Sequence, residues 1–195
     1  MITAAEIAHG LAGAIRVVRL DVGVRDWFDD SFVAARRSFW GVALIFPLFV
    51  AVELMPLPEG TPPSGGFDLG LTLTGYVIAA TAYPLAAWHL TRAFGVAASY
   101  ARYLTAYNWF GVLQSAVFAP IYILVSLAGG DLSTFLMVYF ADRLCFVIYA
   151  VFLARVMLRA EFGHAMILMV ADLMISQSLG QLIAAIKAGP LTPGA

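Results

Sequence analysis

The stretch FLMVYFADRLCFVIYAVFLARVMLR, residues 135–159, is long and apolar enough to cross a bilayer, yet it carries an acid and a base near its middle. A charged side chain at the centre of a bilayer costs a few kcal/mol, about 2.5–3.5 kcal/mol on insertion scales. Asp142 and Arg143 therefore need polar partners, which only other membrane-spanning segments can supply. This requirement predicts a packed bundle of helices and not a single membrane anchor.

The composition excludes several classes of protein. Apolar residues make up 62% and charged residues 12% of the 195 positions, against about 45–50% and 25% in soluble domains, and the mean hydropathy is +0.89. The net charge of −1 gives no basic signature for binding nucleic acid. The single cysteine, Cys145, excludes an internal disulfide and any paired-cysteine motif. We therefore expect an integral membrane protein.

Five apolar segments each reach the ~20 residues that a helix needs to cross the hydrocarbon core. We predict an all-α bundle of five transmembrane helices within a domain over 31–187, with spans at 31–55, 70–92, 107–128, 132–155 and 164–186. Residues 56–69 are rich in proline and glycine and predict an irregular loop. Residues 93–106 predict an interfacial segment, and 188–195 a flexible tail.

Residues 1–30 predict a cytoplasmic region built from an amphipathic helix and a polar linker. Thr3 and Glu6 form a capping box at the start of a helix over residues 3–20. Ile7, Leu11 and Ile15 recur at helical spacing and form an apolar stripe. Two alternatives stay open for this stripe. It lies on the membrane surface or against a partner protein, or it packs on the protein's own loops.

Basic residues fall at alternate ends of the predicted spans. Nine arginines precede the first span or follow the second and fourth spans, at ends that lie on one side of the membrane, whereas only Lys187 lies near a span end on the other side. The nine are Arg16, Arg19, Arg25, Arg36, Arg37, Arg92, Arg102, Arg155 and Arg159. The positive-inside rule then places the N-terminus in the cytoplasm. Trp27, Trp40, Trp88 and Trp109 are predicted to form an aromatic belt at that interface. The composition, rich in alanine and arginine and poor in lysine, is typical of a bacterial protein. We therefore expect the inner membrane, with a periplasmic C-terminus.

Polar residues form stripes on three of the spans, and such stripes should face away from lipid. The residues that we predict to form a buried polar cluster are Asn108, Ser115, Tyr139, Asp142, Arg143, Asp172, Ser176, Gln177 and Gln181. The rise of ~1.5 Å per helical residue places Arg143 and Asp172 at similar depths. We expect these two to form an ion pair, and Asp142 to bond to a tyrosine, asparagine or glutamine. Two alternatives stay open: a cluster that only fixes helix packing, or a proton or ligand site.

Motifs for known chemistry are missing from the sequence. It contains no GxSxG elbow, no Walker loop and no paired catalytic carboxylates. His9, His89 and His164 are too scattered for a HExxH metal site or for haem ligation. We therefore predict that the protein is not an enzyme, with no catalytic residues, no cofactor and no metal.

The predicted topology resembles that of the Yip1-like membrane proteins, which have five spans, a cytoplasmic N-terminus and bacterial members whose role is not established. Local support comes from Gly75–Tyr76 in the second span and from a first span that carries Pro47 after a basic segment. The acidic-Leu-Tyr-Gly-Pro signature of the eukaryotic members is missing. The resemblance therefore implies a fold, but neither a trafficking role nor functional residues.

These patterns predict an accessory or assembly protein that binds partners through its surface helix and transmembrane faces. The alternatives are a small transporter or proton-linked channel that uses Asp142, Arg143 and Asp172, and a lipid-binding protein. The expected partners are membrane lipids and other membrane proteins or further copies of the chain, and not nucleic acid.

Overall fold

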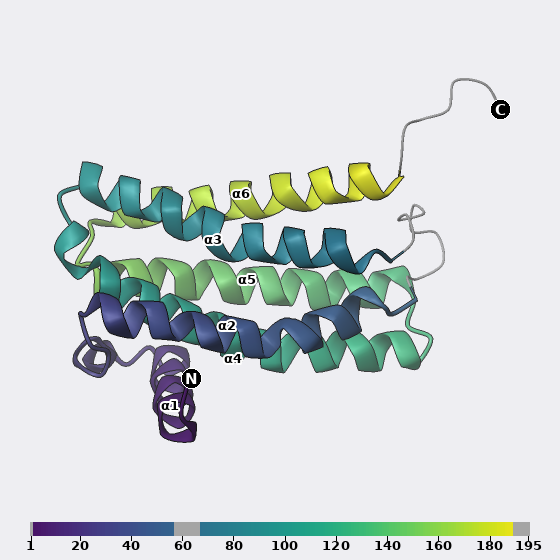
Figure 1. Cartoon of the computed structure of the whole chain (residues 1–195), viewed down its shortest axis with the longest axis horizontal. Coiled ribbons are helices and arrows are strands. Elements are labelled where there is room, and N and C mark those ends of the chain that lie inside the picture. Colours follow the sequence, from purple (N-terminus) through teal and green to yellow (C-terminus); the bar gives the residue numbers. More distant parts are fainter. Residues whose placement is uncertain (1, 57–66, 189–195) are drawn as a thin grey trace.

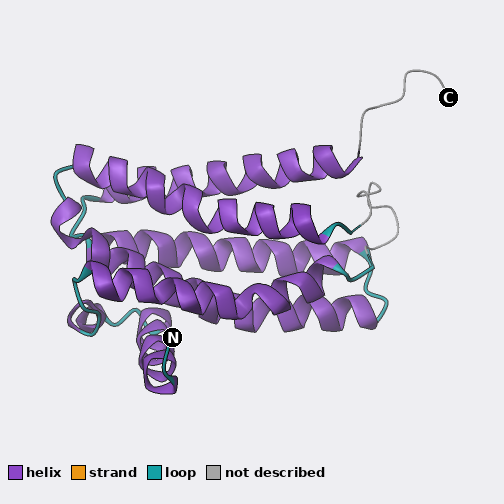
Figure 2. Ribbon diagram, in the orientation of Figure 1, coloured by secondary structure: helices purple, strands orange, loops and turns teal. Residues whose placement is uncertain are grey.

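The computed structural model describes residues 2–56 and 67–188, and all regular structure within these ranges is helical (Figure 2). Most of the predicted irregular loop and of the C-terminal tail lies outside the described residues. The elements are α1 (Ala4–Val18), η1 (Val22–Asp26), α2 (Phe32–Glu53), α3 (Leu69–Ala93), η2 (Ala97–Ser99), α4 (Tyr100–Leu127), α5 (Leu132–Met157) and α6 (Phe162–Ala188).

The five long helices are each long and apolar enough to cross a membrane, which confirms the predicted five spans. Side-chain caps fix where three of them begin, because the first amide groups of a helix have no partner within it. Ser31, Asp68 and Asp131 accept hydrogen bonds from the amides of residues three positions on, at 3.2, 2.6 and 2.9 Å. Pro47, Pro84 and Pro120 lie inside α2, α3 and α4, and each helix continues through its proline.

One boundary differs from the prediction. The segment 93–106 was expected to lie at the interface, but α4 begins at Tyr100 and continues to Leu127. Its 28 residues rise about 42 Å, which exceeds the ~30 Å hydrocarbon core. The polar residues that indicated an interface, including Tyr100 and Tyr103, are buried by neighbouring helices. Tertiary packing therefore extends the helix beyond its apolar run.

The five helices run alongside one another (Figure 1). They pack in the ring order α2, α4, α5, α6, α3, and the contact that closes the ring, between α2 and α3, is much weaker than the others. The apolar core gathers toward the end where α2, α4 and α6 begin. In α4, every buried residue falls between Tyr100 and Val112, and none falls between Leu113 and Leu127. The other half of the ring therefore leaves space inside.

Helix α1 runs across the direction of the long helices, near the end of the bundle that holds the core (Figure 1). Gly10 lies directly against the indole ring of Trp109 in α4, and Gly13 against the Phe28 ring. Ala14 and Val17 are fully buried. The face of α1 that packs on the protein is therefore the one that carries these four residues. The apolar stripe is divided, because Ile7 and Leu11 pack against the core whereas Ile15 is 44% exposed, so both alternatives for the stripe stay open. Trp109, predicted to lie in an aromatic belt, is instead buried between α1 and α2 at 5% exposure.

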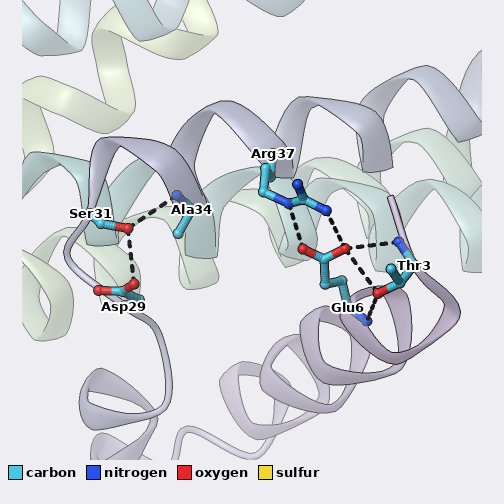
Figure 3. Close-up of polar contacts among 6 residues, drawn as sticks. All are labelled: Thr3, Glu6, Asp29, Ser31, Ala34 and Arg37. Atoms are coloured by element: carbon cyan, nitrogen blue, oxygen red, sulfur yellow. Dashed lines mark hydrogen bonds and ion pairs between the residues drawn. The ribbon is translucent and has the colours of Figure 1, made fainter. Parts of the chain in front are cut away.

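An ion pair joins α1 to the start of α2 (Figure 3). The Glu6 carboxylate accepts from Arg37 at 2.5 and 2.6 Å, and it also accepts from the Thr3 amide at 2.8 Å, which confirms the predicted capping box. The Arg37 guanidinium and the Thr3 groups lower the pKa of Glu6 from 4.5 to about 2. The carboxylate therefore stays ionised at neutral pH.

The linker over residues 21–30 is packed into the same end of the bundle, although its composition predicts a solvated segment. Arg25 donates to the carbonyls of Val156 and Met157 in the last turn of α5, and to Ser99 Oγ at 3.1 Å. The last carbonyls of a helix have no partner within it, so these bonds cap α5. Arg102 pairs with Asp30 across 3.6 Å. Basic side chains at this end therefore fasten the linker to three helices.

Candidate functional site

The ring contains a partly open cavity of about 500 Å³ that is lined by side chains from all five long helices. Seven of the nine residues predicted to form a polar cluster lie on its wall: Asn108, Ser115, Tyr139, Asp142, Arg143, Asp172 and Ser176. Gln177 lies just outside and donates to the Tyr139 hydroxyl at 2.6 Å. Gln181 is exposed on α6 and takes no part in the cavity wall. The polar stripes of three spans therefore meet at one place.

The first polar group on the wall is centred on Asp142, which is 8% exposed. Arg143 Nη2 lies 2.9 Å from Asp142 Oδ2, and Gln114 Nε2 donates to Asp142 Oδ1 at 2.5 Å. The glutamine partner confirms the predicted class of residue beside Asp142. Gln114 itself was not predicted, although it adjoins Ser115 on the polar stripe of its span. Asp142 thus receives one charged and one neutral partner.

The predicted ion pair between Arg143 and Asp172 is wrong. Arg143 bonds to the aspartate beside it in α5, and its guanidinium also lies 5.7 Å from the Tyr139 and Phe146 ring centres. Both carboxylates lie on the cavity wall with the one guanidinium, so the similar depth that was predicted for Arg143 and Asp172 is not enough to decide the pairing. Arg143 pairs with Asp142 because the two residues are neighbours in the sequence, whereas Asp172 accepts hydrogen bonds from hydroxyl groups.

The second polar group is centred on Asp172, which is 3% exposed. The Tyr107 hydroxyl donates to Asp172 Oδ2 at 2.7 Å, and Ser176 Oγ contacts Oδ1 at 3.4 Å. Tyr107 was not predicted; it lies one helical turn before Gly111 on the polar stripe of α4. Its ring packs 4.9 Å from that of Tyr83 in α3, whose hydroxyl is hydrogen-bonded to the Tyr103 hydroxyl. Tyr107 therefore bonds directly to the Asp172 carboxylate, and Tyr83 and Tyr103 pack behind the Tyr107 ring.

Asn108 and Tyr76 join helices at the cavity wall. Asn108 Nδ2 donates to Ser38 Oγ at 2.8 Å, and Ser38 in turn donates to a carbonyl of its own helix, so this contact ties α4 to α2. Tyr76 of α3 donates its hydroxyl to the Val42 carbonyl at 2.6 Å and lies with its ring 5.0 Å from that of Phe49. It therefore bridges the weak seam between α2 and α3 beside the cavity, and a ring contact between Phe32 and Trp88 bridges the same two helices elsewhere.

The fold and the cavity define the class of protein. It is a multi-pass helical membrane protein with an apolar outer surface and a charged, aromatic cavity among its spans. Among the described residues, no group of three or more histidine, cysteine or acidic side chains could hold a metal ion. Compared with known proteins, the chain matches no family model, no curated protein and no solved structure.

Proposed function

We propose that the protein binds an amphiphilic molecule from the membrane, such as a lipid, in the cavity at the centre of its helix ring. The volume of about 500 Å³ falls within the ~300–1,000 Å³ of typical small-molecule sites. Apolar side chains dominate the wall, and a few polar groups converge at one place. The observation that carries the proposal is this convergence, because charged side chains inside a membrane are costly and are retained mainly at functional sites.

Filling the cavity should remove the bound molecule without disturbing the fold. Gly111 lies on the cavity wall, and a Cβ placed there would meet nothing within 4 Å. Gly111→Phe should therefore project a ring into the cavity and lower the amount of amphiphile retained after extraction in mild detergent. We expect a loss of roughly tenfold, which corresponds to about 1.4 kcal/mol of binding free energy. Native mass spectrometry of the purified protein measures the retained mass.

Gly180→Phe is the matched control for that measurement. Gly180 is also a helical glycine with open space around it, but it does not line the cavity. It should retain as much amphiphile as the unchanged protein. Equal retention by both variants, or no amphiphile on the unchanged protein, would show that the cavity is not a binding site.

The predicted accessory or assembly role is a second proposal, but the structure offers it less support. One face of α1 is already engaged, because Gly10 and Gly13 pack on α4 and the linker, and only the exposed part of its apolar stripe, at Ile15 and Val18, is left for a partner. An accessory role would require the protein to migrate in a native gel within a larger assembly that contains a reproducible partner. Transport through the cavity also stays a prediction, and flux measured on Asp172 and Arg143 variants tests it.

We further propose that the protein lies in a bacterial inner membrane with its N-terminus in the cytoplasm and its C-terminus in the periplasm. The support is the gathering of nine arginines toward one end of the bundle, opposite Lys187. Kinship with the Yip1-like proteins is proposed on the same topology.

In a Cys145→Ala background, Asp26→Cys tests this orientation. A membrane-impermeant maleimide should label the introduced cysteine in inverted vesicles and not in intact spheroplasts. The reverse pattern would overturn the orientation.

A further inference from the structure

The cavity holds one more negative than positive charge. Its charged lining residues are Asp142, Arg143 and Asp172. The first two pair with each other at 2.9 Å, so their charges cancel within the wall. Within the described parts of the chain, no lysine or arginine forms an ion pair with Asp172, whose partners are the neutral hydroxyls of Tyr107 and Ser176. An ionised Asp172 therefore has no ion pair of its own, because Arg143, which acts on it through space, is paired with Asp142, and unpaired charge is costly in this medium.

The rest of the wall suits a positive charge. Eight lining residues are aromatic, among them Tyr107, Phe118 and Tyr122. The faces of aromatic rings carry partial negative charge and attract cations, most strongly where water is excluded. The cavity already holds a cation in this way, because the Arg143 guanidinium lies 5.7 Å from two ring centres.

The same cavity wall is less suited to binding an anionic ligand. It would face the Asp172 carboxylate, and the one lining cation is already paired with Asp142. Arg143 Nε has no hydrogen-bond partner among the described residues, but it is covered by protein. A ligand could not reach that atom without displacing the side chain.

We propose that the cavity binds a lipophilic organic cation, with the Asp172 carboxylate as its counter-ion and the surrounding aromatic rings as its apolar contact. The inference rests on the proposed function, because it names the chemical class of the amphiphile. It is independent of where such a cation comes from, whether a free molecule or the ammonium head group of a lipid.

Two probes of matched size and opposite charge test the inference. The full-length protein in nanodiscs of neutral lipid is dialysed against tetraphenylphosphonium or tetraphenylborate, and empty nanodiscs supply the background partitioning. We expect saturable binding of tetraphenylphosphonium that exceeds the background, and no saturable binding of tetraphenylborate. Preference for the anion would overturn the inference.

Variants of Asp172 separate charge from shape. Asp172→Asn keeps an acceptor for the Tyr107 hydroxyl but removes the charge, and it should weaken tetraphenylphosphonium binding at least tenfold. Asp172→Glu keeps the charge and should retain most of the binding. Equal thermal unfolding of Asp172→Asn and the unchanged protein in detergent shows that the loss in the asparagine variant is not a loss of folding. Asp26→Asn, an exposed aspartate in η1 outside the cavity, is the matched control and should bind as the unchanged protein does. Equal binding by Asp172→Asn and the unchanged protein would overturn the inference.

The Gly111→Phe variant distinguishes failure of this inference from failure of the proposed function. If the cavity binds an amphiphile of another charge, Gly111→Phe still removes the retained amphiphile while Asp172→Asn has no effect on tetraphenylphosphonium. That outcome would overturn the inference that the ligand is a cation, and it would leave the proposal that the cavity is a binding site standing. If neither Gly111→Phe nor Asp172→Asn changes any bound molecule, both the cation and the cavity site are overturned.

The same preparation distinguishes the two sources of the cation, which are the head group of a retained lipid such as phosphatidylethanolamine and a free organic cation. Displacement of a retained ammonium lipid by tetraphenylphosphonium would identify the lipid head group as the source of the cation. Saturable binding of tetraphenylphosphonium to protein that retained no lipid would identify a free cation as the ligand. Both results support the inference.

Discussion

Replacing Gly10 by alanine should detach α1 from the bundle and lower the free energy of unfolding by about 1–3 kcal/mol, the usual cost of overpacking a core. A Cβ at this position would lie 2.2 Å from two atoms of the Trp109 indole ring. The ring has little freedom to move away, because Gly41 of α2 approaches it on another side, with its own Cβ position 3.1 Å from the ring. Thermal unfolding in detergent measures the stability. Tryptic cleavage at Arg16 and Arg19 measures the release of α1.

Gly180→Ala provides the comparison for this substitution. Both glycines lie within helices, so both changes gain up to about 1 kcal/mol from the better helix propensity of alanine. Only the Gly10 variant gains the clash, because a Cβ at Gly180 meets nothing within 4 Å. If the two variants were equally stable and equally resistant to trypsin, the contact between Gly10 and Trp109 would not hold α1 in place.

The destination of α1 illustrates what periodicity can and cannot predict. Helical spacing of apolar residues predicted the helix and one half-buried stripe, but the face that is fully buried lies beside that stripe and carries Gly10, Gly13 and Ala14. Gly10 and Gly13 carried the missing information. In the sequence they only weaken a helix, whereas in the structure they permit close approach to aromatic rings. Small residues spaced along one face of an amphipathic helix therefore indicate close packing of that face against protein.

The spans were predictable because the length of an apolar run depends on the bilayer alone. The start of α4 was not, because residues 100–106 become helical and buried through contacts with segments distant in the chain. The rise per residue gives a position along each helix, but it does not give the rotation of the helix about its axis. That rotation decides which side chains meet, and it is why Tyr107 and Gln114 were missed and Arg143 was assigned the wrong partner.

Arg143→Met should be the most destabilising substitution on the cavity wall, with a loss of about 3–5 kcal/mol in the free energy of unfolding. It removes the one cationic partner of Asp142 and leaves a carboxylate at 8% exposure with Gln114 alone. Adding Asp142→Asn to the same chain removes the unpaired charge, and the double variant should recover about 2 kcal/mol of that loss. Unfolding in mixed micelles with increasing sodium dodecyl sulfate, followed by tryptophan fluorescence, measures all three variants.

The double variant decides whether the two side chains act as a pair. If they do, the losses in the two single variants sum to more than the loss in the double variant, because each single change strands the other charge. Arg155→Met, on an exposed position of the same helix, controls for the loss of an arginine and should change the stability by less than ~0.5 kcal/mol. Additive losses would mean that Asp142 and Arg143 are stabilised separately. The sum of the lining charges would be unchanged, but Arg143 would then not be committed to Asp142 and could serve as the counter-ion of Asp172.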